Sequence, residues 1–263
     1  MKPFQKDLKG KDCSPEGFAK TVKELTTKGR DKFFTWFDGG GAVDGAFNKA
    51  EGIFLNLIYP HFLKYGGRDP IDSISLDIGY GGGGQVSAAT KFFNYALGVD
   101  VHGEKEYVIK ELVNRSSPNY VLFQTNGMDL QPIMTGHVDF VHSWVTLIHV
   151  GYIEVVKSYI SECFRVLRPG GVGVLFFSRL VRSKQMQTEK EWFADLKEEK
   201  EHPIGYIERG TWMSVNTVNL KISMWWMVDE IERQGFTIME GVCSNSDGFF
   251  HGQQGVVFKK DFS

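Results

Sequence analysis

The sequence has few cysteines, and they lie far apart. Cys13, Cys163 and Cys243 have neither the short spacing of a metal-binding motif nor the density of a disulfide framework. We therefore expect no metal site and no disulfide bond. An excess of charge of one sign is also missing, because 30 Lys and Arg face 32 Asp and Glu, for a net charge of −2. This balance argues against a nucleic-acid partner, since proteins that bind nucleic acids usually carry a basic face.

Long apolar runs are missing too. No stretch is long and apolar enough to cross a bilayer. Residues 1–6 lack the apolar run of a signal peptide. We expect a cytoplasmic protein without a membrane partner, as a monomer or a homodimer. What the sequence does contain is 42% apolar residues, including 21 phenylalanines, which is ample for one large core.

Short apolar segments alternate with helix-length segments through the middle of the chain. The segments that we expect to be strands are 73–78, 95–101, 120–124, 138–143 and 172–178. Apolar residues at helical spacing predict a helix over 153–167, and residues 168–171 then end it and turn the chain into the next strand. This rhythm predicts βαβ units and a parallel sheet covered by helices.

The last part of the chain changes character. Ile222, Trp225, Val228 and Ile231 recur at helical spacing and predict an amphipathic helix that ends near Gly235. Two final strands are expected at 236–242 and 254–260, and the Ser/Asn/Gly-rich loop between them predicts antiparallel pairing.

Two segments lie outside the alternation. Residues 1–70 are expected to form a helical N-terminal cap, with an aromatic cluster at 33–37. Residues 71–263 form the main predicted domain, and residues 180–215 are expected to be a lid inserted into it.

A glycine-rich loop follows the first predicted strand. Residues 76–84 read LDIGYGGGG, and such glycines let the backbone turn sharply and let a ligand approach the main chain. Gly79, Gly81 and Gly84 also fit the G-x-G-x-x-G pattern of dinucleotide folds. Asp77 favours a different ligand, because a carboxylate here would repel a pyrophosphate but suits the positively charged S-adenosylmethionine. Alternatively, Asp77 only caps N–H groups of the loop.

A second acid ends the second predicted strand. Asp100 is placed to accept hydrogen bonds from the two ribose hydroxyls of an adenosine. Since both candidate cofactors contain a ribose, Asp100 supports a nucleoside without choosing between them. The alternative is an ordinary exposed aspartate at a strand end.

Together these residues resemble the class I S-adenosylmethionine-dependent methyltransferases, from about residue 73 to residue 260. Residues 77–83 look like the family's acid-plus-glycine motif, and 98–101 like its ribose-binding strand end. Residues 138–143 resemble its fourth-strand motif, and 164–171 resemble its R-V-L-K-P-G-G turn. The resemblance implies an α/β, Rossmann-like, seven-stranded sheet with an antiparallel last strand, and S-adenosylmethionine as the cofactor.

The resemblance also implies a set of cofactor contacts. The residues concerned are Asp77, Gly79, Tyr80, Gly81, Asp100, Val101, Asn126, Gly127, Met128, Ser143 and Trp144. One position departs from the family, in which many members place a Gly-Asp pair after the third strand and use the Asp to bind the adenine amino group. Here Asn126 and Asp129 are rivals for that contact, and the sequence leaves the choice open.

Catalysis of methyl transfer rests largely on holding the nucleophile close and in line. A base helps only where the acceptor must lose a proton. His149 is the candidate base, and its alternative role is to cap a helix that starts near Gly151. His137, His142 and Asp139 could suggest a metal site, but two histidines an odd number of residues apart on a strand point to opposite faces. We therefore expect no metal.

Residues outside the sheet are expected to shape the acceptor site, because loops at the carboxyl edge of such a sheet form the binding crevice. The expected pocket walls are Trp36, Phe37, Arg179, Trp212 and Met213. For Trp212 and Met213 the alternative is plain packing. An aromatic, non-basic cap favours methylation of an oxygen or nitrogen of a small molecule. Alternatives are methylation of a protein or peptide side chain, and a catalytically silent cofactor-binding subunit. A nicotinamide-dependent oxidoreductase is disfavoured by Asp77 and the reversed last strand.

Overall fold

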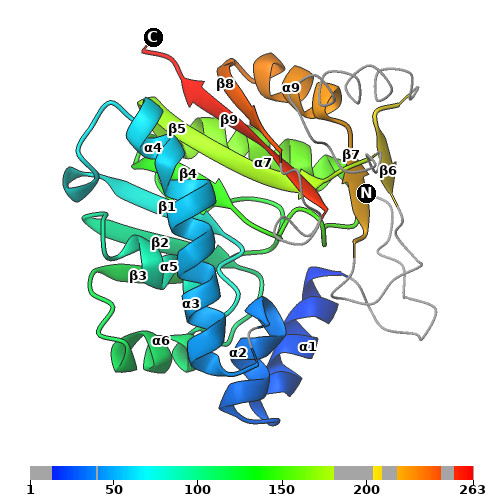
Figure 1. The fold of residues 1–263 in the computed structure, drawn as a ribbon. Coiled ribbons are helices and arrows are strands. Elements are labelled where there is room, and N and C mark those ends of the chain that lie inside the picture. Colours follow the sequence, from blue (N-terminus) through cyan, green and yellow to red (C-terminus); the bar gives the residue numbers. More distant parts are fainter. Residues whose placement is uncertain (1–13, 40, 181–203, 209–217, 244–251, 263) are drawn as a thin grey trace.

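The structure is a computed structural model, and it describes residues 14–39, 41–180, 204–208, 218–243 and 252–262. A seven-stranded sheet with the strand order β3-β2-β1-β4-β5-β9-β8 forms its centre, with helices on both faces (Figure 1). The strands are β1 (Ile74–Ile78), β2 (Tyr95–Asp100), β3 (Tyr120–Gln124), β4 (Val138–Ser143), β5 (Leu167–Ser178), β8 (Phe236–Val242) and β9 (Gln253–Lys260). The predicted Rossmann-like sheet is confirmed, and β3, β4 and β8 have the predicted bounds.

The direction of the strands also follows the prediction. β1 lies between β2 and β4 and is parallel to both, so that Leu76 is paired with Leu97 on one side and with Val141 on the other. β9 is antiparallel to both of its neighbours, β5 and β8. The reversed strand near the end of the chain is therefore confirmed.

β5 begins five residues earlier than predicted. The expected turn at 168–171 lies inside the strand, where the pairing with β4 shifts between Val138–Leu167 and Phe140–Val172. Gly170 has a φ of 79° in this irregular stretch. The chain thus leaves the preceding helix directly into the sheet, and the Pro-Gly-Gly segment forms a bulge instead of a separate turn.

The two faces of the sheet have separate cores. α7 (Ile153–Val166) and α9 (Met224–Arg233) cover one face, against side chains such as Leu76 and Val141. α5 (Gly84–Ala89), α6 (Lys105–Asn114) and the N-terminal helices cover the other face, against side chains such as Ala96 and Phe140. Cys163 of α7 is fully buried in the first core, and this burial raises the pKa of its thiol, as expected of a packing residue.

The predicted helical N-terminal segment is confirmed from residue 14 onward. It consists of α1 (Pro15–Thr26), α2 (Arg30–Asp38), α3 (Val43–Ile53), the π-helix η1 (Phe54–Ile58) and α4 (Tyr59–Tyr65), and we call these the cap. Ser14 starts α1, because its hydroxyl accepts a hydrogen bond from the Gly17 N–H at 3.0 Å. Phe33 and Phe34 of the aromatic cluster are buried in the core that the cap shares with the sheet. Whether the cap counts as a domain of its own stays a prediction.

The predicted C-terminal helix is shorter at its start than expected. Ile222 belongs to β7 (Leu220–Ile222), which forms a small antiparallel hairpin with β6 (Tyr206–Glu208). α9 starts after Ser223, whose hydroxyl accepts a hydrogen bond from the Trp226 N–H at 3.3 Å. Most of the predicted lid at 180–215 lies outside the described residues.

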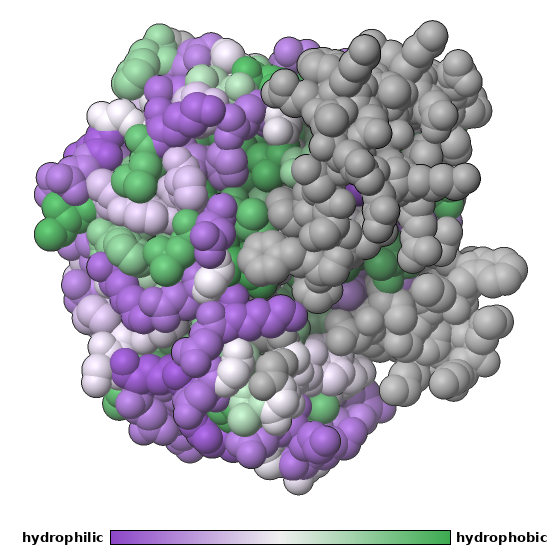
Figure 2. Space-filling view, viewed as in Figure 1, coloured by the Kyte–Doolittle hydropathy of each residue, from purple (hydrophilic) through white to green (hydrophobic). Residues whose placement is uncertain are grey.

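The described surface is mixed in character. Figure 2 shows polar residues over much of the face that carries the cap, with apolar residues in smaller groups. Among the described residues, no helix is both long and apolar enough to cross a membrane.

The order of the strands determines where a ligand can bind. Chain connections leave β1 toward one edge of the sheet and β4 toward the other edge. In open α/β sheets, the crevice beyond the carboxyl ends of two such strands is the usual binding place. The glycine-rich loop follows β1 at this edge, and the cap helices α1 and α2 lie near the same edge (Figure 1).

Candidate active site

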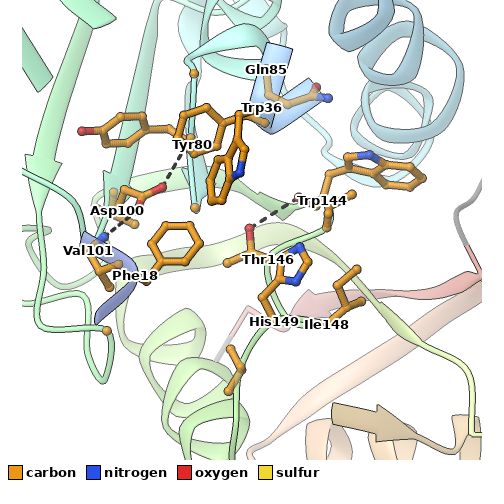
Figure 3. A pocket seen from close by; sticks show the side chains of 18 of the residues that line it. Phe18, Trp36, Tyr80, Gln85, Asp100, Val101, Trp144, Thr146, Ile148 and His149 are labelled. Atoms are coloured by element: carbon orange, nitrogen blue, oxygen red, sulfur yellow. Dashed lines mark hydrogen bonds between the residues drawn. The ribbon is translucent and has the colours of Figure 1, made fainter. Parts of the chain in front are cut away.

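A cavity of about 520 Å³ lies beyond the carboxyl ends of β1, β2 and β4. Its lining comes from the glycine loop, the strand ends, the segment after β4 and the cap (Figure 3). The predicted site residues that line it are Trp36, Phe37, Gly79, Tyr80, Gly81, Asp100, Val101, Gly127, Trp144 and His149. The structure therefore brings together most of the residues that the sequence singled out.

The glycine loop is a cradle that side chains would fill. Gly79 and Gly81 have φ of 84° and 50°, in the left-handed region that favours glycine. A Cβ on Gly79 would lie 2.1 Å from the hydroxyl oxygen of Thr146, and one on Gly81 would lie 2.8 Å from the ring of Phe37. The main chain of the loop is therefore open to close approach by a ligand only because side chains are missing there.

Asp100 is held against this loop from the end of β2. Its Oδ2 accepts a hydrogen bond from the Gly81 N–H at 2.9 Å, and its Oδ1 accepts one from the Val101 N–H at 2.7 Å. A carboxylate offers about four acceptor positions, so capacity remains for the hydroxyl of a ligand. The placement fits the predicted ribose contact, which stays a prediction.

His102 is a residue of this site that the sequence reasoning missed. Its Nδ1 accepts a hydrogen bond from the Glu104 N–H at 3.2 Å, which places the ring proton on Nε2. Nε2 lies 3.0 Å from the Gly81 carbonyl oxygen and donates to it. The ring is fully buried and lies 5.8 Å from that of Phe37, centroid to centroid. The sequence contained one indication of this residue, because His102 follows the predicted ribose-binding Asp100 by two positions.

The segment after β4 forms a second wall. Thr146 and Ser143 both donate their hydroxyl protons to the Ile78 carbonyl oxygen, at 2.9 Å and 3.0 Å. Val145 has a φ of 65°, which is a strained conformation for a β-branched residue, and its N–H donates to Gln253 Oε1 at 3.1 Å. Trp144 lines the cavity, and its ring lies 4.6 Å from that of Phe176. Ser143 does not line the cavity, because its side chain joins two strands.

Asp77 does not lie in the cavity, where the predicted contact with the cofactor would place it. Two residues before the first glycine, it is still inside β1, and the register pairs it with His142 of β4. Its carboxylate is buried, 3.5 Å from His142 Nδ1, and it does not line the cavity. Complete burial lowers the pKa of His142 to about 3, so this imidazole is neutral at neutral pH. The predicted acid is thus close to the glycine loop in sequence, but its side chain lies within the sheet and not in the cavity.

The turn after β3 also departs from the prediction. Asn126 Oδ1 accepts hydrogen bonds from the N–H groups of Met128 and Asp129, at 2.7 Å and 3.1 Å. Its amide nitrogen donates to the Asp129 carboxylate at 2.8 Å. Both rivals for the adenine contact are therefore engaged with each other in a local turn, and neither they nor Met128 line the cavity. Gly127 does line it, with a φ of 76°.

The cap supplies the aromatic wall. Trp36 and Phe37 line the cavity together with Phe18, and the ring of Trp36 lies 5.6 Å from Phe18 and 4.9 Å from Phe37. Arg179 is not among the lining residues, because it is buried beside β9 and its Nε donates to the Gln253 carbonyl oxygen at 3.1 Å. Trp212 and Met213 lie outside the described residues.

His149 points its imidazole ring into the cavity, below Thr146 (Figure 3). Both polar groups of its main chain are hydrogen-bonded. The His149 N–H donates to the Thr146 carbonyl oxygen at 3.0 Å, and the His149 carbonyl oxygen accepts from Asn219 Nδ2 at 3.0 Å. The helix-capping alternative is not seen, since α7 starts after Tyr152 and has no side-chain cap. A histidine ring that lines a ligand-sized cavity is the type of group that serves as a general base.

The described residues contain no cluster of His, Cys, Asp and Glu that could hold a metal ion. Asp139, the acid considered for such a site, accepts a hydrogen bond from the Ile74 N–H at 2.8 Å and pairs with Arg168 at 2.6 Å. Its role is to join the starts of β1, β4 and β5.

Solved structures with the same fold are similar to this chain. One from Methanosarcina mazei, described as a SAM-dependent methyltransferase, is 20% identical, with a TM-score of 0.56 over 78% of this chain and 99% of that one. Another SAM-dependent methyltransferase, from Aquifex aeolicus, is 14% identical, with a TM-score of 0.53 over 81% of this chain and 96% of that one. These likenesses show the fold.

The family comparison is more specific, because residues 76–175 match the family described as a methyltransferase domain. Residues 76–175 therefore form a methyltransferase domain. The matched residues run from β1 to β5 and include the glycine loop, Asp100 and His149. The protein is thus an enzyme of the methyltransferase class, and S-adenosylmethionine is its cofactor. No curated protein matches the chain in sequence.

The cavity fits this cofactor by its own features. The open glycine main chain can receive the methionine part, and the Asp100 carboxylate retains capacity for a ribose hydroxyl. The cap residues Phe18 and Trp36, together with Lys49, lie outside the matched segment but line the same cavity. One side of the cavity is therefore formed by the segment that matches the family, and the other side is formed by the cap, which lies outside that segment.

Proposed function

We propose that this methyltransferase methylates an oxygen or nitrogen atom of a small organic acceptor that binds under the cap. The observation that carries the proposal is the shared cavity, in which the His149 ring and the aromatic cap wall meet the glycine loop. Its volume of about 520 Å³ lies within the range of small-molecule sites, roughly 300–1,000 Å³. Aromatic walls with few polar groups suit a compact organic molecule.

The protein's own contribution is mainly to hold two molecules in line. Asp100 would accept hydrogen bonds from the ribose, and Gly127 and Val101 would border the adenine. When bound, S-adenosylmethionine supplies a methyl group on a sulfonium, a reactive electrophile with a good leaving group. Positioning of this kind lowers a barrier by up to roughly 7–11 kcal/mol in favourable cases.

His149 would take the proton that an oxygen or nitrogen acceptor loses. Its anchored main chain limits where the ring can lie, and the ring lies near Thr146 in the cavity that the glycine loop also lines. A general base of this type contributes about 10²–10⁴-fold to a rate.

The acceptor class is tested with S-adenosylmethionine carrying a tritiated methyl group. The purified enzyme is incubated with the small-molecule fraction and, separately, with the macromolecular fraction of a cell extract. We expect label in a small-molecule product and none with Asp100→Ala, which weakens the cofactor site. Label found only in macromolecules would contradict the proposal, as would the absence of label in both fractions with S-adenosylhomocysteine still binding.

The role of His149 is tested on the labelled product. We expect His149→Ala to lower kcat/KM by about 10²–10⁴-fold and to remove the acidic limb of the pH profile. Affinity for S-adenosylhomocysteine, measured by calorimetry, should change little. His137→Ala is the matched control, because His137 does not line the cavity. An unchanged pH profile in His149→Ala would show that the base is assigned to the wrong residue.

A further inference from the structure

One end of the cavity, between α3 and α5, contains polar groups that neither the sequence analysis nor the proposed mechanism uses. Lys49 and Ile53 lie one turn apart on α3, and Gln85 lies in the first turn of α5. All three line the cavity. Figure 3 shows Asp100 and Gln85 at different ends of the cavity, with Trp36 between them. This end is therefore separate from the ribose side.

Gln85 is the first of these groups. Its side chain is only 7% exposed, and within the described part of the chain neither its amide oxygen nor its amide nitrogen has a hydrogen-bond partner. Burial of an amide with both atoms unpaired is unfavourable, and native proteins rarely retain one without a reason. At a cavity wall, the physical reason is a ligand that supplies the missing partners.

Lys49 is the second group. Its ammonium nitrogen lies 3.9 Å from the position that a Cβ on Gly39 would occupy, and it forms no ion pair with any acid in the described ranges. Among the described lining residues, the carboxylate is Asp100, at the other end. The cavity thus has a negative charge near the expected ribose and a positive charge on the α3 side, near the end of α2.

We propose that Lys49 and Gln85 bind a carboxylate of the methyl acceptor, so that the enzyme acts on small organic acids. Lys49 pairs with the charge, and the Gln85 amide N–H donates to the same carboxylate. The Gln85 oxygen then accepts from an N–H or O–H of the acceptor. Gln85 lies inside the segment that matches the family, whereas Lys49 and Trp36 lie outside it. The charged partner thus belongs to the cap, which favours the acceptor over the shared cofactor as the source of the carboxylate. The inference rests on the proposed function.

The test is calorimetry on the enzyme saturated with S-adenosylhomocysteine, and it needs no turnover. Matched probes with and without a carboxylate are titrated: anthranilate against aniline, 4-hydroxybenzoate against phenol, and indole-3-acetate against 3-methylindole. We expect at least one acid to bind ten-fold or more tightly than its neutral partner. Lys49→Met should abolish this preference, whereas Lys110→Met, the same charge change on α6, should keep it. If no acid binds more tightly than its neutral partner, the proposal is wrong.

A second arm identifies whose carboxylate is bound. S-adenosylhomocysteine and methylthioadenosine, which lacks the amino-acid part, are titrated into the wild type and Lys49→Met. We expect Lys49→Met to change neither affinity more than two-fold. A ten-fold loss for S-adenosylhomocysteine alone would assign Lys49 to the cofactor and overturn the proposal.

Gln85→Met adds a stability readout to the binding readout. Since it removes an unpaired buried amide, we expect a higher melting temperature of the free enzyme together with ten-fold weaker binding of the acid. A lower melting temperature with unchanged acid affinity would contradict the role of Gln85. Because these arms measure binding, they remain separate from the labelling experiment, whose failure would concern the proposed reaction alone.

Discussion

Gly79 combines two constraints that no side chain meets. Its φ of 84° is unfavourable for any other residue, and a Cβ there would collide with the Thr146 hydroxyl at 2.1 Å. Thr146 cannot easily turn away, because that hydroxyl donates to the Ile78 carbonyl oxygen. The open main chain of the loop therefore requires glycine at this position.

We expect Gly79→Ala to lower the free energy of unfolding by about 1–2 kcal/mol for the backbone conformation and by a further 1–3 kcal/mol for the overpacking. S-adenosylhomocysteine binding should be lost with it. Two controls separate the causes: Gly136→Ala has a positive φ in open space, and Gly151→Ala has neither constraint. Urea unfolding and calorimetry give the readouts. Equal stability of the Gly79 and Gly136 variants would refute the steric argument.

Single residues also show which parts of the site could be predicted from the sequence. The glycines and Asp100 are in place because their roles depend on main-chain geometry directly after a strand, which a local motif specifies. Asp77 and Asn126 are not in the cavity, because Asp77 is buried inside β1 beside His142 and Asn126 is bonded within the turn after β3. Such partners depend on neighbouring strands and on turn geometry, which a single motif does not reveal.

At the scale of elements, the contact between the cap and α6 holds the aromatic wall over the cavity. Glu111 of α6 is 2% exposed and accepts hydrogen bonds from Arg30 Nε at 2.7 Å and from Arg115 Nε at 2.8 Å. Arg30 starts α2, the helix that carries Trp36 and Phe37. The side chain of Arg115 also lies over the ring of Phe47 in α3, at 3.9 Å. Glu111 thus connects two cap helices to the sheet domain.

We expect Glu111→Gln to lower the free energy of unfolding by about 1.5–3 kcal/mol, the value of a hydrogen bond to a charged group. The cap should also become more sensitive to limited proteolysis. Glu154→Gln serves as the control, because Glu154 forms an exposed pair with Lys157 and such pairs contribute only about 0.2–1 kcal/mol. Similar losses in both variants would mean that the cap is held in another way.

Elements were predicted well where their pattern is local. Short apolar segments located the strands of the large sheet and helical spacing located α7, whereas β5 and α9 differed at their starts. In both cases the boundary follows from pairing with a neighbouring strand, through the bulge opposite β4 and through the hairpin of β6 with β7. Pairing partners lie far away in the sequence, so spacing alone cannot locate such boundaries.

For the molecule as a whole, His142 makes the free energy of unfolding depend on pH. It lies in the centre of the sheet with its ring 5.6 Å from that of Phe54 and 5.5 Å from that of Phe140, and neither of its ring nitrogens has a hydrogen bond among the described residues. Its folded-state pKa of about 3 lies below the ordinary value of 6.5. The unfolded chain therefore binds the proton first, and stability falls as the pH drops from 6.5 toward 3.

We expect acidification from pH 6.5 to pH 5 to cost the wild type about 2 kcal/mol more than His142→Phe, at about 1.4 kcal/mol for each pH unit. Urea unfolding at several pH values provides the comparison. His137→Phe is the control, since its ring is not completely buried. Parallel pH dependence in the wild type and the His142 variant would show that another group causes the acid sensitivity.

The amino-acid sequence by itself determined most strands of the large sheet, the glycine loop and the acid at the end of β2, because these depend on local runs of apolar residues and on backbone freedom within a few positions. The cavity's other side was decided only by the tertiary structure. Phe18, Lys49 and Gln85 come from three different helices, and they line one cavity because the cap packs on the same core as α5. Each is ordinary in its local sequence. What distinguishes them is their position beside a ligand-sized space, and that position depends on packing between segments that are distant in the chain.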